Sequence, residues 1–408
     1  MRIVISDYLG HAPQVQLSRA LAARGHDVLH LYSGDVQSPK ADLMRQAGDP
    51  PGLAIEGLSI GAPRAQSFFA RRRQEAKFGR LLAQRATAFQ PDAVMACNNP
   101  LDAQSKVQSA CTGADIPFIY WMQDFQSLAI DRAISDRGAI MNIVVGGYYH
   151  GLERKLLQRS DAIVPIADDM LGILSESWDI YERQCMVVHN WSPLAKLTPG
   201  AKNNAWSRAQ GIADRKVALY TGSLGPMESP MLLVELAEKL KDRSDALVLV
   251  ISEGAGSGEI ARTAKSRGLT NLRVLPFQPY ESYGDVLASA DVLLAMVDGQ
   301  AGALYVPSKA NSYLCAGRAI VIAAPWQNFA ATTIQESQGG SVVPPDDAAA
   351  MADAVTALLV DDKRRAEAAA HAREYAERMF EISAIAERFE RLFMRLATGT
   401  PRHHLPQQ

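Results

Sequence analysis

Short runs of apolar residues recur along the chain and alternate with segments of helical pattern. These runs cover residues 2–6, 27–32, 53–58, 92–96, 117–121, 162–165 and 185–188 in the first half, and 217–220, 247–251, 272–275, 291–297, 319–324 and 341–343 in the second. Short apolar runs of this kind are typical of strands that are buried on both faces. Their alternation with helices predicts parallel sheets with helices on both sides.

The segments between these runs predict the helices. They cover residues 15–24, 67–89, 152–159, 170–178, 230–240, 258–267, 283–289, 308–317, 329–336 and 348–359, followed by a helical tail over residues 363–396. We expect this tail to bend near Phe380.

A polar segment rich in Gly, Pro and Asn separates the two alternating series, between residues 189 and 216. A chain of 408 residues is also too long for a single core. The sequence therefore predicts an α/β protein with two facing Rossmann-like domains, each built on a parallel sheet. The first would contain residues 1–192 and a returning C-terminal helix, 381–396, and the second residues 193–380.

The segment 302–317 lies between two predicted strands and has the pattern of a loop followed by a short helix. Pro307 would close the loop, Ser308 would cap the helix, and Gly317 would end it. Lys309 would then stand at a helix N-terminus, where free N–H groups and the helix dipole favour an anion such as phosphate. A capped crossover helix with an incidental lysine is the alternative.

Ligands of open α/β sheets bind beyond the carboxyl ends of the strands, so the loops that follow strands are candidate sites. In the first such loop, Gly10 permits close backbone approach, and His11 could bind substrate or cap the next helix. Gly222 and Ser223 lie in a glycine-containing loop that could hold an anion, and residues 251–256 form another. No third glycine completes a dinucleotide fingerprint in the Gly222 loop.

Composition narrows the class of protein. The net charge of −2 argues against a nucleic-acid binder, which would normally be basic. The four cysteines form no CxxC pair, and we expect reduced, buried thiols in a cytoplasmic protein. The chain opens directly on a predicted strand, so we expect no signal peptide.

Several of these segments resemble glycosyltransferase family 4, most of all the branch that builds bacterial surface polysaccharides and O-antigens. The resemblance covers nearly the whole chain. It is carried by residues 25–28, 123–124, 159–163 and 189–191 in the first half, and by 220–225, 252–254, 277–280, 289–292, 306–309 and 316–318 in the second.

The resemblance implies the GT-B fold, with the acceptor bound by the first domain and a nucleotide-sugar by the second. It implies transfer of a hexosyl or N-acetylhexosaminyl group with retention of configuration and without a metal. The absence of an Asp-x-Asp triplet from the sequence fits the last expectation. The nucleotide-sugar is a substrate rather than a cofactor, and a UDP-sugar is expected rather than a GDP-sugar.

The same resemblance assigns expected roles to residues. Lys309 would neutralise the departing diphosphate, helped by backbone N–H groups near Ser308, Gly222 and Gly10. Asp124 would hold a sugar hydroxyl, and His11 would complete the catalytic set. The residues expected around the nucleotide are Gly222, Ser223, Glu253, Gly254, Phe277, Gln278, Tyr305, Pro307, Ser308 and Ser312.

The chain departs from the common family pattern at several positions. Many members carry a Glu-x7-Glu pair where this chain has Leu304 and Ser312, and Arg and Lys where it has Ser223 and Glu228. The roles of Ser312, Ser223 and Glu228 therefore stay open. Two other readings stay open with them: a nucleotide-sugar epimerase of the same architecture, and a non-catalytic scaffold in polysaccharide assembly.

The predicted helix over residues 67–89 carries far more cations than acids. Together with Arg64 before it, it contains Arg71, Arg72, Arg73, Lys77, Arg80 and Arg85 against a single acid, Glu75. Either it is a solvated helix face or it binds anionic lipid. The resemblance favours lipid, since such enzymes extend a saccharide on a polyprenyl diphosphate at the cytoplasmic leaflet. We therefore expect a cytoplasmic protein that attaches peripherally to the membrane through residues 71, 72, 73, 77 and 80, with an apolar edge at residues 141–149.

Overall fold

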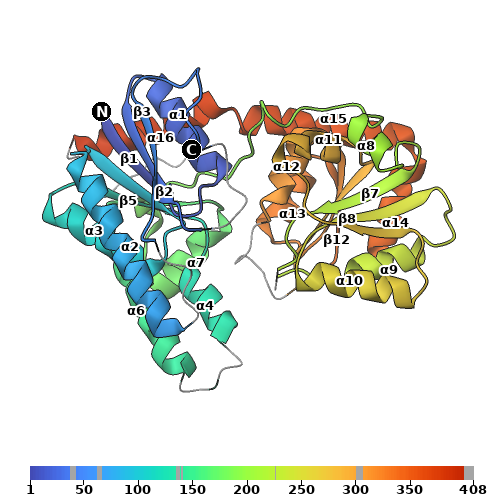
Figure 1. Ribbon diagram of the computed structural model, residues 1–408, viewed down its shortest axis with the longest axis horizontal. Coiled ribbons are helices and arrows are strands. Elements are labelled where there is room, and N and C mark those ends of the chain that lie inside the picture. Colours follow the sequence, from blue (N-terminus) through green and yellow to red (C-terminus); the bar gives the residue numbers. More distant parts are fainter. Residues whose placement is uncertain are drawn as a thin grey trace. The chain divides into compact units, whose positions relative to one another are not determined.

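A computed structural model describes residues 1–36, 43–61, 67–134, 138, 141–225, 227–299 and 307–398 of the chain. It divides into two compact units (Figure 1). Unit 1 contains Met1–Asn190 and Ile382–Gln408, and unit 2 contains Trp191–Glu381. The sequence predicted that the first domain ends at residue 192, and unit 1 ends two residues earlier, at 190. The sequence predicted that the second domain ends at residue 380, and unit 2 ends one residue later, at 381.

Unit 1 is built on a sheet of six parallel strands in the order β3-β2-β1-β4-β5-β6. The strands are β1 (Arg2–Asp7), β2 (Asp27–Ser33), β3 (Leu53–Leu58), β4 (Ala93–Cys97), β5 (Phe118–Met122) and β6 (Ala162–Pro165). In the central strands β4 and β5 every residue is buried. This follows from helices on both faces and explains why these strands are continuous apolar runs in the sequence.

The helices of unit 1 connect and cover this sheet. They are α1 (Ala12–Ala23), α2 (Phe68–Ala88), α3 (Leu101–Gly113), α4 (Gln126–Ile134), the π-helix η2 (Asn142–Gly146), α6 (Gly147–Arg159), α7 (Asp169–Trp178), the 3₁₀ turn η3 (Glu182–Gln184) and α16 (Ile382–Ala397). Helices α2, α3 and α6 pack in a row, and α1 packs against α16 (Figure 1).

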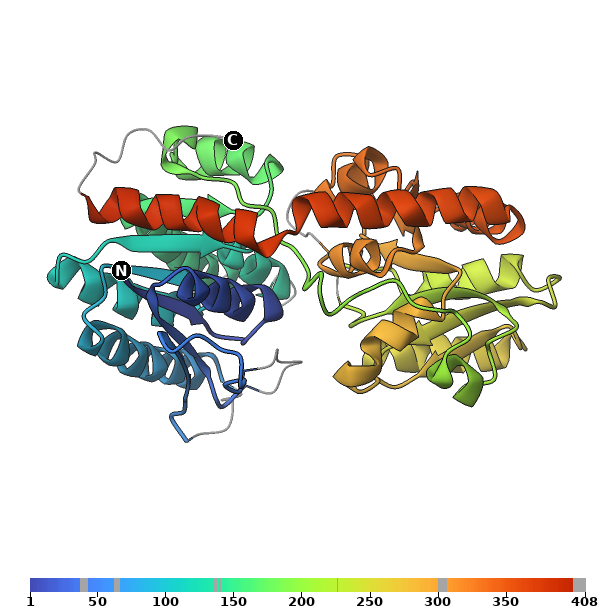
Figure 2. The same ribbon diagram turned by 90° about the horizontal axis from the view of Figure 1, so that it is seen from above.

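Helix α16 is the C-terminal element that the sequence predicted to return to the first domain. Its buried stripe includes Phe389, whose ring lies 5.0 Å from that of Trp121 on β5. At its surface, Glu390 pairs with Arg24 and with His26. Figure 2 shows α15 and α16 as successive red helices, and Phe380 and Glu381 separate them, so the helical tail is interrupted at the place where the sequence predicted a bend.

Unit 2 repeats the architecture with six parallel strands in the order β12-β11-β10-β7-β8-β9. The strands are β7 (Lys216–Thr221), β8 (Ala246–Ile251), β9 (Leu272–Leu275), β10 (Val292–Met296), β11 (Ala319–Ala323) and β12 (Gly340–Val343). The helices are α8 (Ala205–Ala209), α9 (Met231–Lys239), α10 (Ala255–Ser266), η4 (Tyr280–Ser282), α11 (Tyr283–Ala288), α12 (Lys309–Ala316), α13 (Phe329–Glu336), α14 (Ala348–Val360) and α15 (Asp362–Met379).

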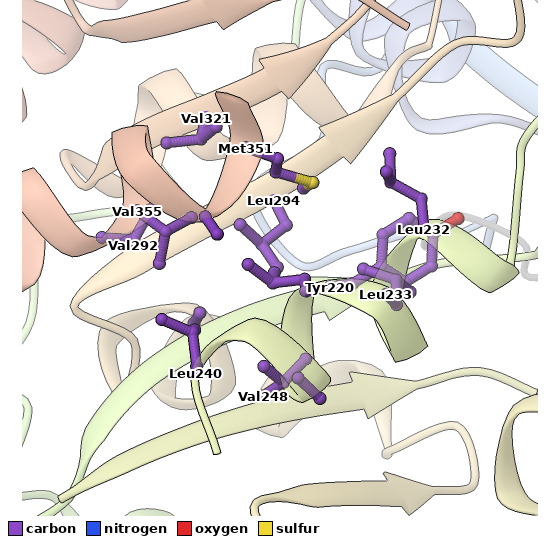
Figure 3. Packing of buried hydrophobic residues seen from close by; sticks show 14 of the residues in the cluster. Tyr220, Leu232, Leu233, Leu240, Val248, Val292, Leu294, Val321, Met351 and Val355 are labelled. Atoms are coloured by element: carbon purple, nitrogen blue, oxygen red, sulfur yellow. The ribbon is translucent and has the colours of Figure 1, made fainter. Parts of the chain in front are cut away.

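The core of unit 2 forms where α9 and α14 press on the strands (Figure 3). Leu233 of α9 and Met351 of α14 are fully buried there, together with Leu294 of β10. Burial of each such side chain is worth about 1.5–3 kcal/mol. This packing fixes where the strands end, and therefore where the loops that follow them lie.

The expected α/β architecture with two parallel sheets is confirmed. One predicted strand, at residues 185–188, is wrong, because only an isolated bridge joins Cys185 to Ile163. The segment still follows β6, with the N–H groups of Met186 and Val188 bonded to its carbonyls. The sequence analysis also missed α3, α4 and α8, since their polar positions hide the helical period.

Candidate functional site

The loop after β7 makes a tight turn at Gly222. Its φ of +136° is a backbone conformation that L side chains rarely adopt. A Cβ atom at this position would lie 3.1 Å from Cε of Lys309, so the lysine stem passes directly beside the glycine. The turn therefore needs glycine both for its backbone and for the lysine beside it.

Lys309 opens helix α12 and sends its side chain into a polar cluster with Tyr220 and Glu228, which we call the Lys309 cluster. The ammonium bonds the Glu228 carboxylate and donates to the Tyr220 hydroxyl at 2.9 Å, and it also lies over the Tyr220 ring. The side chains of Lys309 and Glu228 are only 10% and 1% exposed. Burial lowers the pKa of Lys309, and the Glu228 carboxylate opposes that effect.

Glu228 has further partners within the same loop. Its other carboxylate oxygen accepts the N–H of Gly225 at 2.9 Å, and the hydroxyl of Tyr220 lies 3.0 Å from its first oxygen. One acid thus ties the loop after β7 to the lysine of α12. The sequence analysis left the role of Glu228 open, and the structure gives it this contact.

The structure brings Lys309 and Gly222 together but changes the expected set of backbone donors. The N–H of Gly222 is bonded to Ile251 at 3.1 Å, so it cannot serve an anion. Ser308 stands at the predicted cap position of α12, but its side chain does not cap the helix. In the described part of the chain, the N–H groups of Ser223 and Leu224 donate no hydrogen bond, and these are the donors that the turn offers instead.

The neighbouring loops after β8 and β9 meet at Glu253. Its carboxylate accepts the backbone N–H of Phe277 at 3.0 Å, and the Phe277 ring is exposed beside it. Gly254 has a φ of +104° and leads into the N-terminus of α10. Gln278 is turned away, because its side-chain oxygen accepts from Nε1 of Trp206 at 3.0 Å. Glu253, Gly254 and Phe277 thus share one edge with the Gly222 turn, whereas Gln278 supports α8.

Three more residues were expected to contact the nucleotide: Ser312, Pro307 and Tyr305. The Ser312 hydroxyl lies 3.0 Å from that of Ser192, so it stabilises the packing of α12. Pro307 is buried just before α12. Tyr305 lies outside the described residues, as does Leu304.

At the corresponding edge of unit 1, the loop after β1 is held by Asp7. This buried carboxylate accepts the backbone N–H of His11, and the carbonyl of Asp7 accepts that of Gly10 at 3.3 Å. The Asn98 amide donates to Asp7 at 3.1 Å and lies 3.4 Å from Nδ1 of His11. Burial raises the pKa of Asp7, and His11 opposes this. The Gly10 N–H is therefore also engaged.

Asp7 and Asn98 were not predicted from the sequence as site residues. Each directly follows or ends a buried strand, and Asn98 adopts a φ of +55°, a conformation that asparagine tolerates better than most residues. Polar residues at the ends of β1 and β4 were the signal that could have identified them, because neighbouring parallel strands end at the same edge.

Asp124 follows β5 at the same edge and is exposed to solvent. The protein around it removes part of its hydration and raises the pKa of its carboxyl. The preceding Gln123 accepts from the Asn190 amide at 2.7 Å, so that position is tied to the end of unit 1. Asp124 itself makes no hydrogen bond or ion pair within the described ranges, which leaves its carboxylate available for a ligand.

Two adjacent acids, Asp168 and Asp169, follow β6. Asp168 directly precedes α7, but its side chain bonds His189 at 2.7 Å and does not cap the helix. Burial and the charge of Asp168 raise the pKa of Asp169 to about 6. The two acids thus sit in different environments at the edge of the sheet.

The cations of helix α2 divide into two groups. Arg72 pairs with Asp102 at 3.2 Å and donates to Tyr148 at 2.8 Å, so it belongs to the packing of unit 1 rather than to a free surface. Arg71 pairs with Glu75 but remains 49% exposed. Three exposed cations have no such partner in the described part of the chain: Arg73, Lys77 and Arg80. Arg64 lies outside the described residues.

Exposed apolar side chains lie near this helix. Phe69 is 78% exposed and packs on Phe68, which in turn contacts Tyr149 of α6. In η2, Ile143 and Val144 are also exposed. Within the described ranges, no helix is long and apolar enough to cross a membrane, and no group of three or more His, Cys, Asp or Glu side chains is arranged to hold a metal ion.

Two protein-family models match the chain, one in each half. The model described as "Glycosyl transferase 4-like domain" matches residues 13–191, and the one described as "Glycosyl transferases group 1" matches residues 202–377. The matched ranges follow the two structural units closely.

Curated relatives match over part of their length. The "Putative colanic acid biosynthesis glycosyl transferase WcaI" of Escherichia coli (strain K12) is 26% identical over 175 residues, 42% of this chain and 42% of its own. The "D-inositol 3-phosphate glycosyltransferase" of Salinispora arenicola is 28% identical over 160 residues, 35% of each chain. The chain thus spans about two fifths of the length of these relatives.

Solved structures are similar over nearly the full chain. Sucrose-phosphate synthase from Thermosynechococcus elongatus superposes with a TM-score of 0.74 at 16% identity, covering 98% of this chain and 100% of that one. HepE of Anabaena, solved with UDP-glucose, gives a TM-score of 0.70 at 15% identity, with 97% and 99% covered. WaaG, a glycosyltransferase involved in lipopolysaccharide biosynthesis, gives 0.67 at 14%, with 96% and 99% covered. At these identities the similarity establishes a shared fold.

Proposed function

The chain belongs to glycosyltransferase family 4 and has the GT-B fold, and from this premise we propose that it transfers a sugar from a nucleotide-sugar donor to a lipid-linked or oligosaccharide acceptor in cell-surface polysaccharide synthesis. The surface-polysaccharide setting is supported by the similarity to WcaI, a putative colanic acid biosynthesis glycosyl transferase, and to WaaG, which is involved in lipopolysaccharide biosynthesis. A UDP-sugar is the proposed donor, by analogy with HepE.

The observation that carries the proposal is the edge of unit 2 where the Gly222 turn and Lys309 meet. The turn offers the N–H groups of Ser223 and Leu224, and the lysine ammonium lies directly beside it. Backbone donors next to a buried cation stabilise the charge that develops on a departing diphosphate. Glu253 and Phe277, along the same edge, would border the nucleoside.

The proposed chemistry is same-face transfer, with retention of configuration. The acceptor hydroxyl attacks the anomeric carbon while the bond from that carbon to the diphosphate oxygen breaks. The acceptor proton passes to a leaving diphosphate oxygen, so no protein base and no metal is required. Asp124 would hold a hydroxyl of a bound sugar, and His11, oriented through Asn98, would donate a hydrogen bond nearby.

A screen of UDP- and GDP-sugars by thermal shift tests the donor, because a ligand that binds only the folded state raises its melting temperature. The active donor would then be incubated with acceptors in excess EDTA. We expect a glycosylated product that retains the donor configuration by NMR. An epimerised nucleotide-sugar without acceptor would support the epimerase reading. Full function in cells with Lys309→Ala would support the scaffold.

We further propose that the protein attaches to anionic membranes at the cytoplasmic face through the exposed part of α2. Arg73, Lys77 and Arg80 supply the charge, and Phe69 beside them supplies an apolar anchor. Arg71 contributes less because it is paired, and Arg72 is excluded by its contacts with Asp102 and Tyr148.

Vesicle sedimentation tests the attachment. Each cation near an anionic surface is worth about 1 kcal/mol, so the triple change R73Q/K77Q/R80Q should weaken binding to phosphatidylserine vesicles roughly a hundredfold at low salt. High salt should reduce binding of the wild type. A matched control removes three exposed lysines of unit 2, K239Q/K241Q/K265Q. Equal loss in both triples, or no binding by the wild type at low salt, would contradict the proposal.

A further inference from the structure

The Lys309 cluster contains a feature that diphosphate binding alone does not explain: its cation is already paired. The Glu228 side chain is 1% exposed, and its carboxylate bonds the ammonium from a loop that precedes α12 by about eighty residues in sequence. A buried charge without a partner is strongly unfavourable, and the Glu228 carboxylate is the partner of the Lys309 ammonium. The pair is therefore a fixed part of the turn.

The geometry limits what Lys309 can do. Of its three N–H donors, one goes to Glu228 and one to the Tyr220 hydroxyl. The side chain retains 10% exposure, and it passes beside Gly222, which has no Cβ atom to cover it. The third donor is therefore the one available to an anion at the turn.

We propose that Glu228 is a positioning residue of the donor site: it holds the Lys309 ammonium beside the Gly222 turn, so that the cation and the N–H groups of Ser223 and Leu224 bind one nucleoside diphosphate together. This inference rests on the proposed function, since it assigns the diphosphate to this turn. It gives Glu228 a role in diphosphate binding that requires no contact with the ligand.

The groups around the Lys309 ammonium show how a change at Glu228 can be measured. Tyr220 faces it from β7 and Glu228 from the following loop, while Tyr313, one turn along α12, bonds Thr221. Arg373 of α15 binds the far end of the helix at Cys315. In the part of the chain that the structure describes, Glu228 is the one charged group acting on Lys309, and burial alone would favour the neutral amine.

Glu228→Gln keeps the size of the side chain and removes its charge. We expect the variant to bind UDP with near wild-type affinity at pH 6.5, measured by isothermal titration calorimetry. As the pH rises to 9, its affinity relative to wild type should fall, by up to about tenfold per pH unit once Lys309 loses its proton. The ratio cancels the titration of UDP itself. Glu228→Asp, which restores the charge, should restore the wild-type profile.

Two further variants complete the test. Lys309→Met should lose UDP affinity about 10- to 100-fold at every pH, as expected for removal of a charged donor. Asp291→Asn is the matched control, because Asp291 forms another largely buried pair, with Lys202, at the opposite edge of the same sheet. It should leave both the affinity and its pH dependence unchanged.

The outcomes separate the two proposals. If the wild type binds neither UDP nor GDP, the proposed function fails. If it binds UDP but Glu228→Gln has a constant ratio to wild type across the pH range, or binds more tightly throughout, Glu228 is a spectator or a competitor and the inference is overturned. An unchanged Lys309→Met overturns it as well. A variant that fails to fold by circular dichroism is replaced by Glu228→Asp, whose profile must then match the wild type.

Discussion

Replacing Gly222 by alanine tests the turn on which the site depends. At a φ of +136° an L residue is strained, at a cost on the order of 1–3 kcal/mol. The new methyl group would also lie 3.1 Å from Cε of Lys309, closer than ordinary van der Waals contact, so the lysine must shift. Its ammonium is anchored to Glu228 and Tyr220, which limits that shift. We expect a total loss of about 2–3 kcal/mol in the free energy of unfolding of unit 2.

Differential scanning calorimetry measures this loss. For a unit of this size 1 kcal/mol corresponds to roughly 2–4 °C, so the melting temperature of unit 2 should fall by about 4–12 °C. Gly258→Ala provides the control, because Gly258 lies within α10 and its added methyl group would meet only the flexible end of Arg262 at 3.4 Å. Alanine is favoured over glycine inside a helix, so this variant should gain roughly 0.5–1 kcal/mol.

The melting temperatures of the two glycine variants together decide whether the turn requires glycine at position 222. If Gly222→Ala melts with the wild type while Gly258→Ala is stabilised, the turn relaxes without cost and glycine is not required there. If both variants lose stability equally, the loss does not come from the left-handed backbone. Only destabilisation confined to Gly222→Ala supports the geometry described above.

Two other predictions concern unit 1. Burial raises the pKa of Asp169 to about 6 from an unfolded value of 3.8, so its ionisation costs stability as the pH rises through that window. Asp169→Asn should therefore add about 2–3 kcal/mol at pH 7.5 and nothing below pH ~4 in urea unfolding; a pH-independent effect would contradict this. Phe389→Ala, which empties the contact with Trp121, should cost about 3–5 kcal/mol, whereas Phe389→Leu should cost less than about 1.5. Equal losses in these two variants would argue against tight packing of α16.

Much of the fold follows from the sequence. Parallel strands that are buried on both faces are apolar along their whole length, so apolar runs such as residues 292–296 and 319–323 could be predicted as strands from the sequence. The end of α15 at Met379 and the end of α12 at Gly317, which has a φ of +59°, are likewise set by local sequence. Helices such as α3 were missed because residues as polar as Gln104 and Gln108 are buried in them, and only the surrounding packing explains their burial.

In the candidate site, too, some residues could be predicted from local sequence, whereas their contacts depend on the fold. Gly222 and Lys309 could be proposed from the sequence, because a glycine turn and a lysine at a helix start are local patterns. Their contact, and the identity of the acid that pairs with the lysine, depend on two segments far apart in sequence that the order of β7 and β10 in the sheet makes neighbours. The same holds for Asp7 and Asn98, which meet because β1 and β4 are adjacent. Local pattern fixes which residues can act; strand order, set by the packing of the core, decides which of them meet.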